Sequence, residues 1–244
     1  MNNNKHIDIS DMLPGERRKH ILSLIKGNQS VKVAELSNLL YINEATIRRD
    51  LNLLEKEGYI KRIYGGAVLS TGPDSEIPFA YRKEQYTSEK KAIAKIAANE
   101  VENGDTLFLD SSSTAAYMIP FLKGKTGLKI VTNGAQTVLL MAGLVDSVVI
   151  STGGILRENS LSFAGQSAYE NLSEYFFDKV FFSCHAYSVE NGLMDNNEDE
   201  ARLRRLVIKQ SKRAYLLADK SKEGKTSFYK ICEIDKIYKT ITNE

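Results

Sequence analysis

The first quarter of the chain carries the pattern that most restricts its fold: three short amphipathic segments that follow one another almost without a break. The first begins at Pro14, a favoured first-turn residue, and each segment carries apolar residues three and four positions apart. A turn at residues 41–43 separates the last two; Asn43 is a good N-cap, and Gly58 ends the third segment. This order predicts a helix-turn-helix. The apolar positions of the three segments are Ile21, Leu22, Leu24, Ile25, Val33, Leu36, Leu39, Leu40, Ile47, Leu51 and Leu54.

The ten residues after Gly58 alternate in polarity and contain a glycine pair, which predicts a small hairpin over residues 59–68. Residues 14–68 also hold ten Lys and Arg against six Asp and Glu, a local excess of +4 in a chain whose net charge is +2. A hairpin directly after a helix-turn-helix is the arrangement of a winged helix. We therefore expect residues 14–68 to form a winged helix-turn-helix that binds DNA.

The third segment has an outward face that suits the major groove of DNA. If its apolar stripe faces the core, a rotation of about 100° per residue places Arg49 and Asn52 on the opposite face. Arginine pairs with guanine and asparagine with adenine, while basic residues on a wing contact the backbone or the minor groove. The alternative is an ordinary solvated helix face, which the order of the elements disfavours. The candidate DNA-binding residues are Thr46, Arg48, Arg49, Asn52, Lys61 and Arg62.

Residues 69–78 are rich in turn-forming residues and lack periodicity, so we place a linker there. From residue 79 to 244 short apolar segments alternate with helical ones, which predicts a parallel sheet covered on both faces. The fold class is α/β: an N-terminal winged helix-turn-helix followed by a Rossmann-like, mostly parallel α/β domain. The expected strands are 106–110, 128–132, 147–151, 179–184, 213–218 and 236–242.

Polar residues follow nearly every expected strand, and ligands bind at the carboxyl ends of the strands in open α/β sheets. The first strand ends in Asp110 and a run of hydroxyl residues, 111–114, before a helix; hydroxyl and backbone N–H groups there favour an anion such as phosphate. An ordinary N-cap with extra serines is the alternative, and no Walker Gly-Lys-Ser/Thr occurs. The candidate effector-binding residues are Asp110, Ser111, Ser112, Ser113, Thr114, Asn133, Gly153, Gly154, His185, Asp219 and Lys222.

Two cysteines and three scattered histidines offer no disulfide framework and no zinc-ligand spacing, so we expect no metal and no cofactor. The N-terminus lacks the apolar core of a signal peptide, and no apolar run approaches the roughly 18 residues of a membrane span. We expect a cytoplasmic protein.

The motifs along the chain resemble those of the DeoR family of bacterial regulators. Thr-Ile-Arg-Arg-Asp-Leu at 46–51 and Gly-Gly-Ala-Val at 65–68 are similar to the recognition helix and wing of the family. Residues 109–114, 131–133, 153–157, 165, 191–195, 198, 200 and 217–222 resemble its sensor domain. Two departures are Leu53, where the family often has a polar residue, and His185-Ala186, where relatives often have a charged residue and glycine.

The resemblance covers residues 14–244 and implies a sensor domain over 79–244 similar to ribose-phosphate isomerase. It also implies a repressor of sugar or carbohydrate metabolism genes, relieved by a phosphorylated sugar. Because one winged helix reads only a few base pairs, we expect a homo-oligomer, dimer or tetramer, held by residues 79–244.

The sequence leaves two other functions open. Glu198, Glu200 or Asp219 could serve as a general base in an isomerase-like enzyme. Acidic residues that open a helix are explained more simply by the helix dipole, so we expect no enzymatic activity. In the other alternative, the protein is an architectural DNA binder whose second domain only oligomerises.

Overall fold

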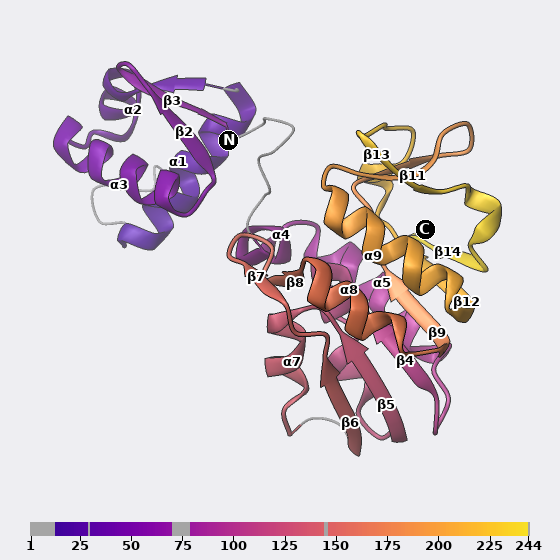
Figure 1. The fold of residues 1–244 in the computed structure, drawn as a ribbon. Helices are drawn as coiled ribbons and strands as arrows, with labels where there is room; N and C mark the ends of the chain where they lie inside the picture. Colours follow the sequence, from indigo (N-terminus) through magenta and orange to yellow (C-terminus); the bar gives the residue numbers. More distant parts are fainter. Residues whose placement is uncertain (1–12, 29, 70–78, 144–145, 244) are drawn as a thin grey trace, which may run out of the picture. The chain divides into compact units, whose positions relative to one another are not determined.

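The computed structural model describes residues 13–28, 30–69, 79–143 and 146–243. The chain divides into two compact units between Pro78 and Phe79 (Figure 1), and each unit is considered by itself. Residues 70–78 of the expected linker lie outside the described residues. Leu69, its expected first residue, is instead the last residue of a strand.

The N-terminal unit contains three helices and a small antiparallel sheet. The helices are α1 (Pro14–Asn28), α2 (Val33–Leu40) and α3 (Glu44–Lys56), and the strands β1 (Ser30–Lys32), β2 (Ile60–Ile63) and β3 (Gly66–Leu69) lie in the order β1-β3-β2. The three helices and the β2–β3 hairpin were predicted, whereas β1 was not. Its position explains one wing glycine: a Cβ on Gly66 would lie 2.2 Å from the carbonyl oxygen of Val31.

The predicted apolar stripes form the core of this unit, apart from Leu24, which is half-buried, and Leu39. Ile47, Leu51 and Leu54 of α3 are buried and pack with buried residues of α1 and α2. Leu39 was expected in the same core but is 55% exposed. Leu36 and Leu40 occupy the core-facing side of the short helix α2, and Leu39 falls beside that side.

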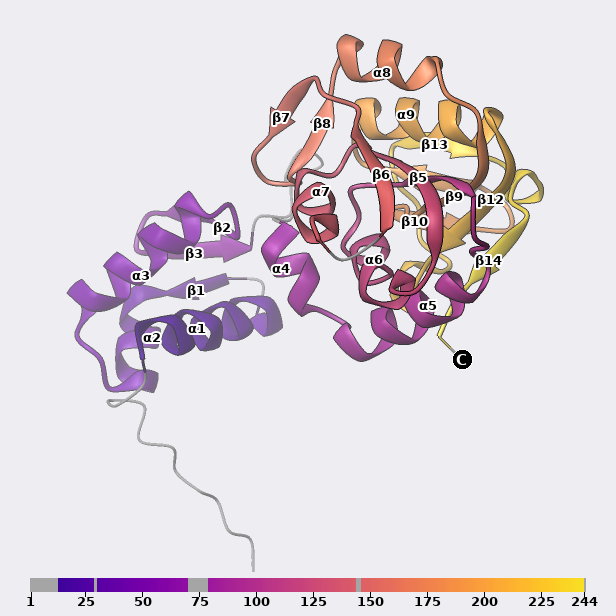
Figure 2. The ribbon, with the colours of Figure 1, turned by 90° about the horizontal axis from the view of Figure 1, so that it is seen from below.

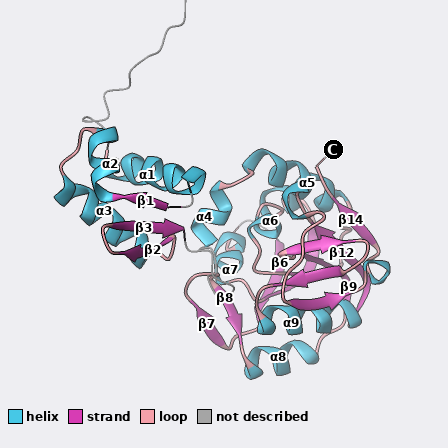
Figure 3. Cartoon of the chain, turned by 90° about the horizontal axis from the view of Figure 1, so that it is seen from above, coloured by secondary structure: helices cyan, strands magenta, loops and turns pink. Residues whose placement is uncertain are grey.

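The C-terminal unit is built on a six-stranded, wholly parallel sheet in the order β14-β12-β9-β4-β5-β6. All six strands were predicted. Their bounds are β4 (Thr106–Leu109), β5 (Thr126–Thr132), β6 (Asp146–Ser151), β9 (Phe177–Phe182), β12 (Ser211–Leu217) and β14 (Lys239–Ile241). Figure 3 shows these strands with helices on either side of them.

Helices cover both faces of the sheet, as the continuous apolar strands predicted. One face packs on α5 (Thr87–Asn99), α6 (Ser113–Ala116), the 3-10 turn η2 (Ile119–Leu122) and α7 (Ala135–Met141). The other packs on α8 (Gln166–Ser173) and α9 (Glu198–Lys209), and Figure 2 shows the two layers. Alternation along β4 separates the two cores: Leu107 and Leu109 point to the first layer, and Phe108 points to the second.

Smaller elements that the sequence did not predict surround the carboxyl edge. They are α4 (Phe79–Glu84), the hairpin β7 (Ile155–Arg157) and β8 (Ser162–Ala164), and a three-stranded antiparallel sheet of β10 (Ala186–Ser188), β11 (Gly192–Asp195) and β13 (Tyr229–Cys232). The 3-10 turns η3 (Lys220–Lys222) and η4 (Ile234–Lys236) complete the unit.

Candidate functional site

The outward face of α3 carries the residues that the helix pattern placed there. Arg48, Arg49 and Asn52 are exposed, while Thr46 is half-buried at the helix start, where its N–H donates to Asn43 Oδ1 at 2.9 Å. Arg48 forms an exposed ion pair with Glu44 at 2.8 Å. Arg49 is therefore the least committed guanidinium on this face.

The back of α3 is tied to α1 by a charged contact. The Asp50 carboxylate is buried and pairs with Arg17 Nε at 2.6 Å, so the buried side of α3 is anchored to α1. An ion pair on one side and an apolar stripe beside it fix the rotation of α3 about its axis. The exposed face is thus presented on a rigid support.

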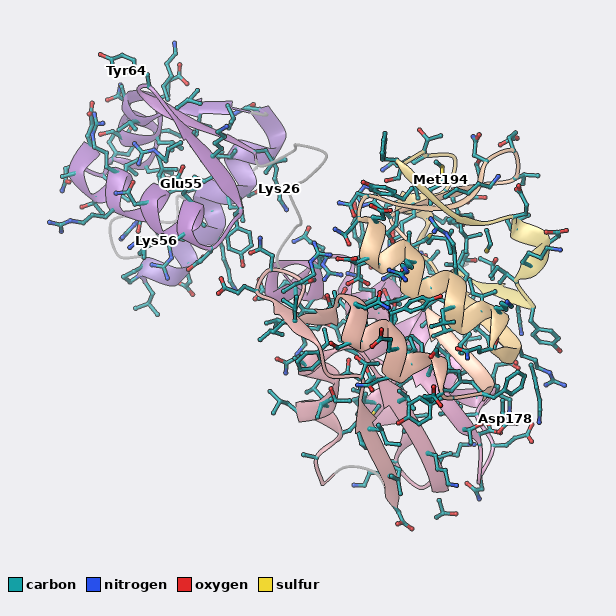
Figure 4. All side chains as sticks on the ribbon, in the orientation of Figure 1. Lys26, Glu55, Lys56, Tyr64, Asp178 and Met194 are labelled. Atoms are coloured by element: carbon teal, nitrogen blue, oxygen red, sulfur yellow. The ribbon has the colours of Figure 1, made fainter. Side chains whose placement is uncertain are left out.

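On the wing, the two basic residues differ in their surroundings. Lys61 is exposed, whereas Arg62 is half-buried and donates to Asn52 Oδ1 at 2.6 Å, to Gly66 O at 3.1 Å and to Arg48 O at 3.3 Å. The sequence pattern did not separate these neighbours. It also missed Tyr64, which is fully exposed at the tip of the β2–β3 hairpin (Figure 4).

In the C-terminal unit, parallel pairing brings the predicted effector residues to one edge of the sheet. Asp110 follows β4, Asn133 follows β5, Gly153 follows β6, His185 follows β9 and Asp219 follows β12. Since these strands are neighbours in the order β12-β9-β4-β5-β6, the loops that carry these residues adjoin one another. The loops contact one another directly through hydrogen bonds from backbone to side chain. Ser111 N donates to Asn133 Oδ1 at 3.0 Å, and Ser183 N donates to Asp110 Oδ2 at 3.0 Å.

The hydroxyl run 111–114 is almost fully buried behind β4. Ser112 caps α6 by accepting from Ala115 N at 3.1 Å, which is the N-cap role that the sequence left open for this run. Helix α6 has a single turn, so the helix dipole behind the run is weaker than that of a full-length helix. An anion here would depend on hydroxyl and N–H groups and on nearby cations.

Asp110 is engaged with protein groups through both carboxylate oxygens. Oδ1 accepts from Ser112 N at 2.9 Å, and Oδ2 accepts from Ser183 N and from Arg204. Its carboxylate therefore organises the edge of the sheet, and a contact with an effector hydroxyl would have to be shared with these donors.

Arg204 of α9 lies at the centre of a buried charge cluster that the sequence did not reveal. Its guanidinium pairs with Asp110 at 3.0 Å, Asp195 at 2.8 Å and Glu200 at 3.3 Å. Three carboxylates around one guanidinium leave an excess of negative charge, and burial raises the pKa of Glu200. Ser162 of β8 also donates to Glu200 at 2.6 Å.

This cluster corrects the expectation that Glu200 merely complements the dipole of α9. The helix does begin with Glu198, Asp199 and Glu200, and Asn197 caps it, but Glu200 is only 4% exposed. A residue this buried makes tertiary contacts that a helix-start pattern cannot predict.

Two lysines at the same edge have no carboxylate partner. Lys222 of η3 donates to Ser183 Oγ at 2.7 Å and to Cys184 O at 2.8 Å, and the ammonium of Lys90 in α5 donates to the Arg82 carbonyl. Among the described residues, no carboxylate lies at ion-pair distance from either ammonium. Burial, followed by the charge of nearby Lys222, lowers the pKa of Lys90 to about 8.

The remaining predicted residues lie around this pair. Asp219 is buried and accepts from Ser221 N at 3.0 Å, and its charge raises the pKa of Lys90. The pKa of His185 is lowered, first by burial; Asp195 raises it, whereas Lys222 and other cations lower it. Of the glycines, Gly154 has a packing role: a Cβ there would lie 2.6 Å from Ala164 O.

The sequence matches two family domains: the DeoR-like helix-turn-helix domain over residues 17–72 and the DeoR C terminal sensor domain over residues 85–244. The chain belongs to the DeoR family. It is a transcriptional regulator with a DNA-binding helix-turn-helix and an effector-sensing domain.

Curated relatives agree with the DeoR assignment over nearly the whole length. The chain is 41% identical to the transcriptional regulator YulB of Bacillus subtilis (95% of this chain and 90% of that protein). It is 36% identical to the transcriptional regulator GolR of Listeria innocua (95% and 91%) and 34% identical to a putative aga operon transcriptional repressor of Escherichia coli O157:H7 (94% and 86%).

Among solved structures, the ribose 5-phosphate isomerase A of Methanocaldococcus jannaschii aligns with a TM-score of 0.41 at 18% identity, covering 55% of this chain and 53% of that chain. In the parts of the chain that the structure describes, no helix is long and apolar enough to cross a membrane, and no cluster of His, Cys, Asp and Glu could hold a metal ion.

Proposed function

We propose that this DeoR-family regulator represses carbohydrate genes and leaves its operator when a phosphorylated sugar, or a closely related phosphorylated metabolite, binds at the carboxyl edge of the C-terminal sheet. The observation that carries the proposal is the pair Lys90 and Lys222. Two ammonium groups at one edge, each bonded only to neutral oxygens, form a preorganised site for a dianion.

The chemistry around the pair suits a sugar phosphate. The run 111–114 supplies hydroxyl donors and the N–H groups of Ser113 and Thr114 for phosphoryl oxygens, since Ser111 N and Ser112 N already donate to Asn133 and Asp110. The polar loops at Asn133, His185 and Asp219 offer partners for sugar hydroxyls. Among the relatives, one of Staphylococcus aureus is a lactose phosphotransferase system repressor, 32% identical over 225 residues. That name supports a carbohydrate-linked role, and both it and the name of the Escherichia coli relative support repression.

We assign DNA binding to residues 14–68 and effector sensing to residues 79–244. The predicted base contacts are Arg49 and Asn52, with Lys61 on the backbone. We also propose that residues 79–244 hold a dimer or tetramer, since a single winged helix reads too few base pairs for a unique genomic address. Light scattering of the full chain tests this assembly, and a monomer at micromolar concentration would contradict it.

A thermal-shift screen tests the effector class. Sugar phosphates such as ribose 5-phosphate are compared with the unphosphorylated sugars, on the parent and on Ser113→Asp. The parent should be stabilised by a phosphorylated compound only, and the aspartate variant should lose the response, because its carboxylate repels phosphate. Equal stabilisation by both sugar forms, or an undiminished response in Ser113→Asp, would overturn the phosphate site.

A further inference from the structure

The side-chain amide of Asn52 is held in one orientation by Arg62. The Arg62 Nη1 group donates to Asn52 Oδ1 at 2.6 Å. A guanidinium carries only donors, so the amide atom that it meets must be the oxygen, and the choice between the two amide orientations is set by chemistry. The NH2 group of Asn52 therefore points away from Arg62. Asn52 itself is exposed on the outward face of α3.

Arg62 is itself fixed from both sides. Its Nε donates to Gly66 O on the neighbouring strand at 3.1 Å, and Nη1 also donates to Arg48 O on α3 at 3.3 Å. Its backbone N–H donates to Glu55 Oε1 at 2.6 Å, which ties β2 to α3 a turn beyond Asn52; Figure 4 labels Glu55 on the helix. The Arg62 side chain is bound to the wing, to the backbone of α3 and to the Asn52 side chain. Few of its donors therefore remain for a DNA phosphate.

We infer that Arg62 is a positioning residue that makes Asn52 a reader of keto bases. In the major groove, an outward NH2 group can donate to the acceptors N7 and O6 of guanine and O4 of thymine. Adenine offers its acceptor N7 directly beside the amino donor N6, and cytosine offers only the amino donor N4, so both face an NH2 group less favourably. The adenine contact usual for asparagine needs the amide oxygen to accept from N6. Here that oxygen already accepts a charge-assisted bond from Arg62 at 2.6 Å, which fixes the direction of the amide and leaves one lone pair for any further donor. Guanine or thymine is therefore preferred over adenine and cytosine.

This inference rests on Asn52 contacting bases, as proposed above, and goes beyond it by naming the base class and the residue that sets it. It also replaces the expectation that Arg62 holds the DNA backbone. The two roles differ in a measurable way, because a phosphate contact strengthens binding to all sequences and adds to the salt dependence, whereas an orienting contact changes preference at one base pair.

The experiment begins with selection of binding sites from random DNA by the full-length protein. The affinity for the selected site is then measured with all four base pairs at each position. The position that loses discrimination in Asn52→Ala is the Asn52 position. There the parent should prefer guanine or thymine over adenine and cytosine by about tenfold or more, the lower range of a good base contact.

Two variants and one control substitution, Lys61→Met, separate the possible outcomes. Arg62→Met frees the amide, so the keto preference should fall at least threefold with an unchanged salt slope, while Lys61→Met, the exposed neighbour, should weaken all sites alike. Asn52→Asp keeps the acceptor for Arg62 but has no NH2 group, so its preference should move toward cytosine and adenine. This variant leaves the wing contact intact and stays informative if Arg62→Met folds poorly.

An adenine preference of the parent at the Asn52 position would overturn the inference. It would also be overturned if Arg62→Met lost affinity equally for all sequences with a salt slope lower by about one, the signature of a phosphate contact. If Asn52→Ala keeps discrimination at every position, Asn52 is not a base contact; the proposed DNA-reading role of Asn52 then fails together with the inference.

Discussion

The ammonium group of Lys90 donates a hydrogen bond to the main-chain carbonyl of Arg82, which joins α5 to α4. Lys90 is only 5% exposed, and the charge of Lys222 lies close enough to lower its pKa. A buried cation beside a second cation is unfavourable, and the nearby Asp219 carboxylate offsets this only in part, since the net effect still lowers the pKa of Lys90. An anion bound between these lysines would remove this electrostatic cost, which links the stability of the edge to effector binding.

Replacement of either lysine should therefore weaken effector binding. We expect Lys90→Met and Lys222→Met each to lower affinity for a phosphorylated sugar by about tenfold or more, since each removes a charge-assisted bond of roughly 1.5–3 kcal/mol. Calorimetric titration on the full chain checks this. Lys212→Met, which removes an exposed lysine paired with Asp178, is the matched control and should bind like the parent.

The lowered pKa of Lys90 predicts a pH dependence of stability. Because the folded pKa of about 8 lies below the ordinary lysine pKa of 10.5, the unfolded chain binds more protons between these values. The free energy of unfolding without ligand should rise with pH across this window, by about 3 kcal/mol at most. Urea unfolding of the parent and Lys90→Met at pH 7 and pH 10 measures it, and an identical pH response of the two proteins would refute it.

The charge cluster around Arg204 should respond strongly to loss of the guanidinium. Arg204→Met leaves three buried carboxylates without their cation and should lower the free energy of unfolding by about 3–5 kcal/mol. Lys212→Met breaks a pair whose lysine is 67% exposed and should cost less than about 1 kcal/mol. Similar losses in the two variants would show that the Arg204 cluster contributes no more than a surface pair.

The adjacent glycines after β6 should differ in their tolerance of a side chain. Both have positive φ, but a Cβ on Gly154 would meet Ala164 O at 2.6 Å and Ala168 Cβ at 2.9 Å, whereas one on Gly153 would find its nearest neighbour, Asn171 Nδ2, at 3.8 Å. Gly153→Ala should cost about 1 kcal/mol from backbone strain, and Gly154→Ala should cost clearly more. Thermal unfolding of both variants measures the two stability costs, and equal costs would argue against the packing role of Gly154.

On the DNA side, Arg49 should carry base specificity. Arg49→Ala is expected to weaken operator binding by about 1–3 kcal/mol and to relax preference at one base pair. Anisotropy titrations with the selected site and its single-base variants give both quantities. Operator affinity equal to that of the parent would mean that the outward face of α3 has been assigned wrongly.

Much of the fold was predictable because its elements are regular. The 3.6-residue stripe of Ile47, Leu51 and Leu54 identified α3 and its outward face, and the continuous apolar strands identified a parallel sheet with one polar edge. Strand β1 and the strands of the small sheets are three or four residues long, too short for a period to show.

The chemistry of the edge was only partly predictable. Lys222 lies in the polar segment that directly follows β12, so its place at the carboxyl edge of the sheet could be predicted from the sequence. Lys90 lies inside an amphipathic helix more than a hundred residues earlier, where it looks like any solvated lysine. Likewise, the bond between Arg62 and Asn52 joins a wing to a helix, and only the packed structure brings the two residues together.

The most direct test of the account measures DNA release by the effector. Fluorescently labelled operator, saturated with the full-length protein, is titrated with the phosphorylated sugar that stabilises the protein most and, in parallel, with its unphosphorylated form. A ligand shifts only the states that it binds with different affinity, so the phosphorylated compound should release the DNA at concentrations where the free sugar has no effect. Lys90→Met should require about tenfold more of it. DNA that stays bound at saturating sugar phosphate, or equal release by both forms, would contradict the account.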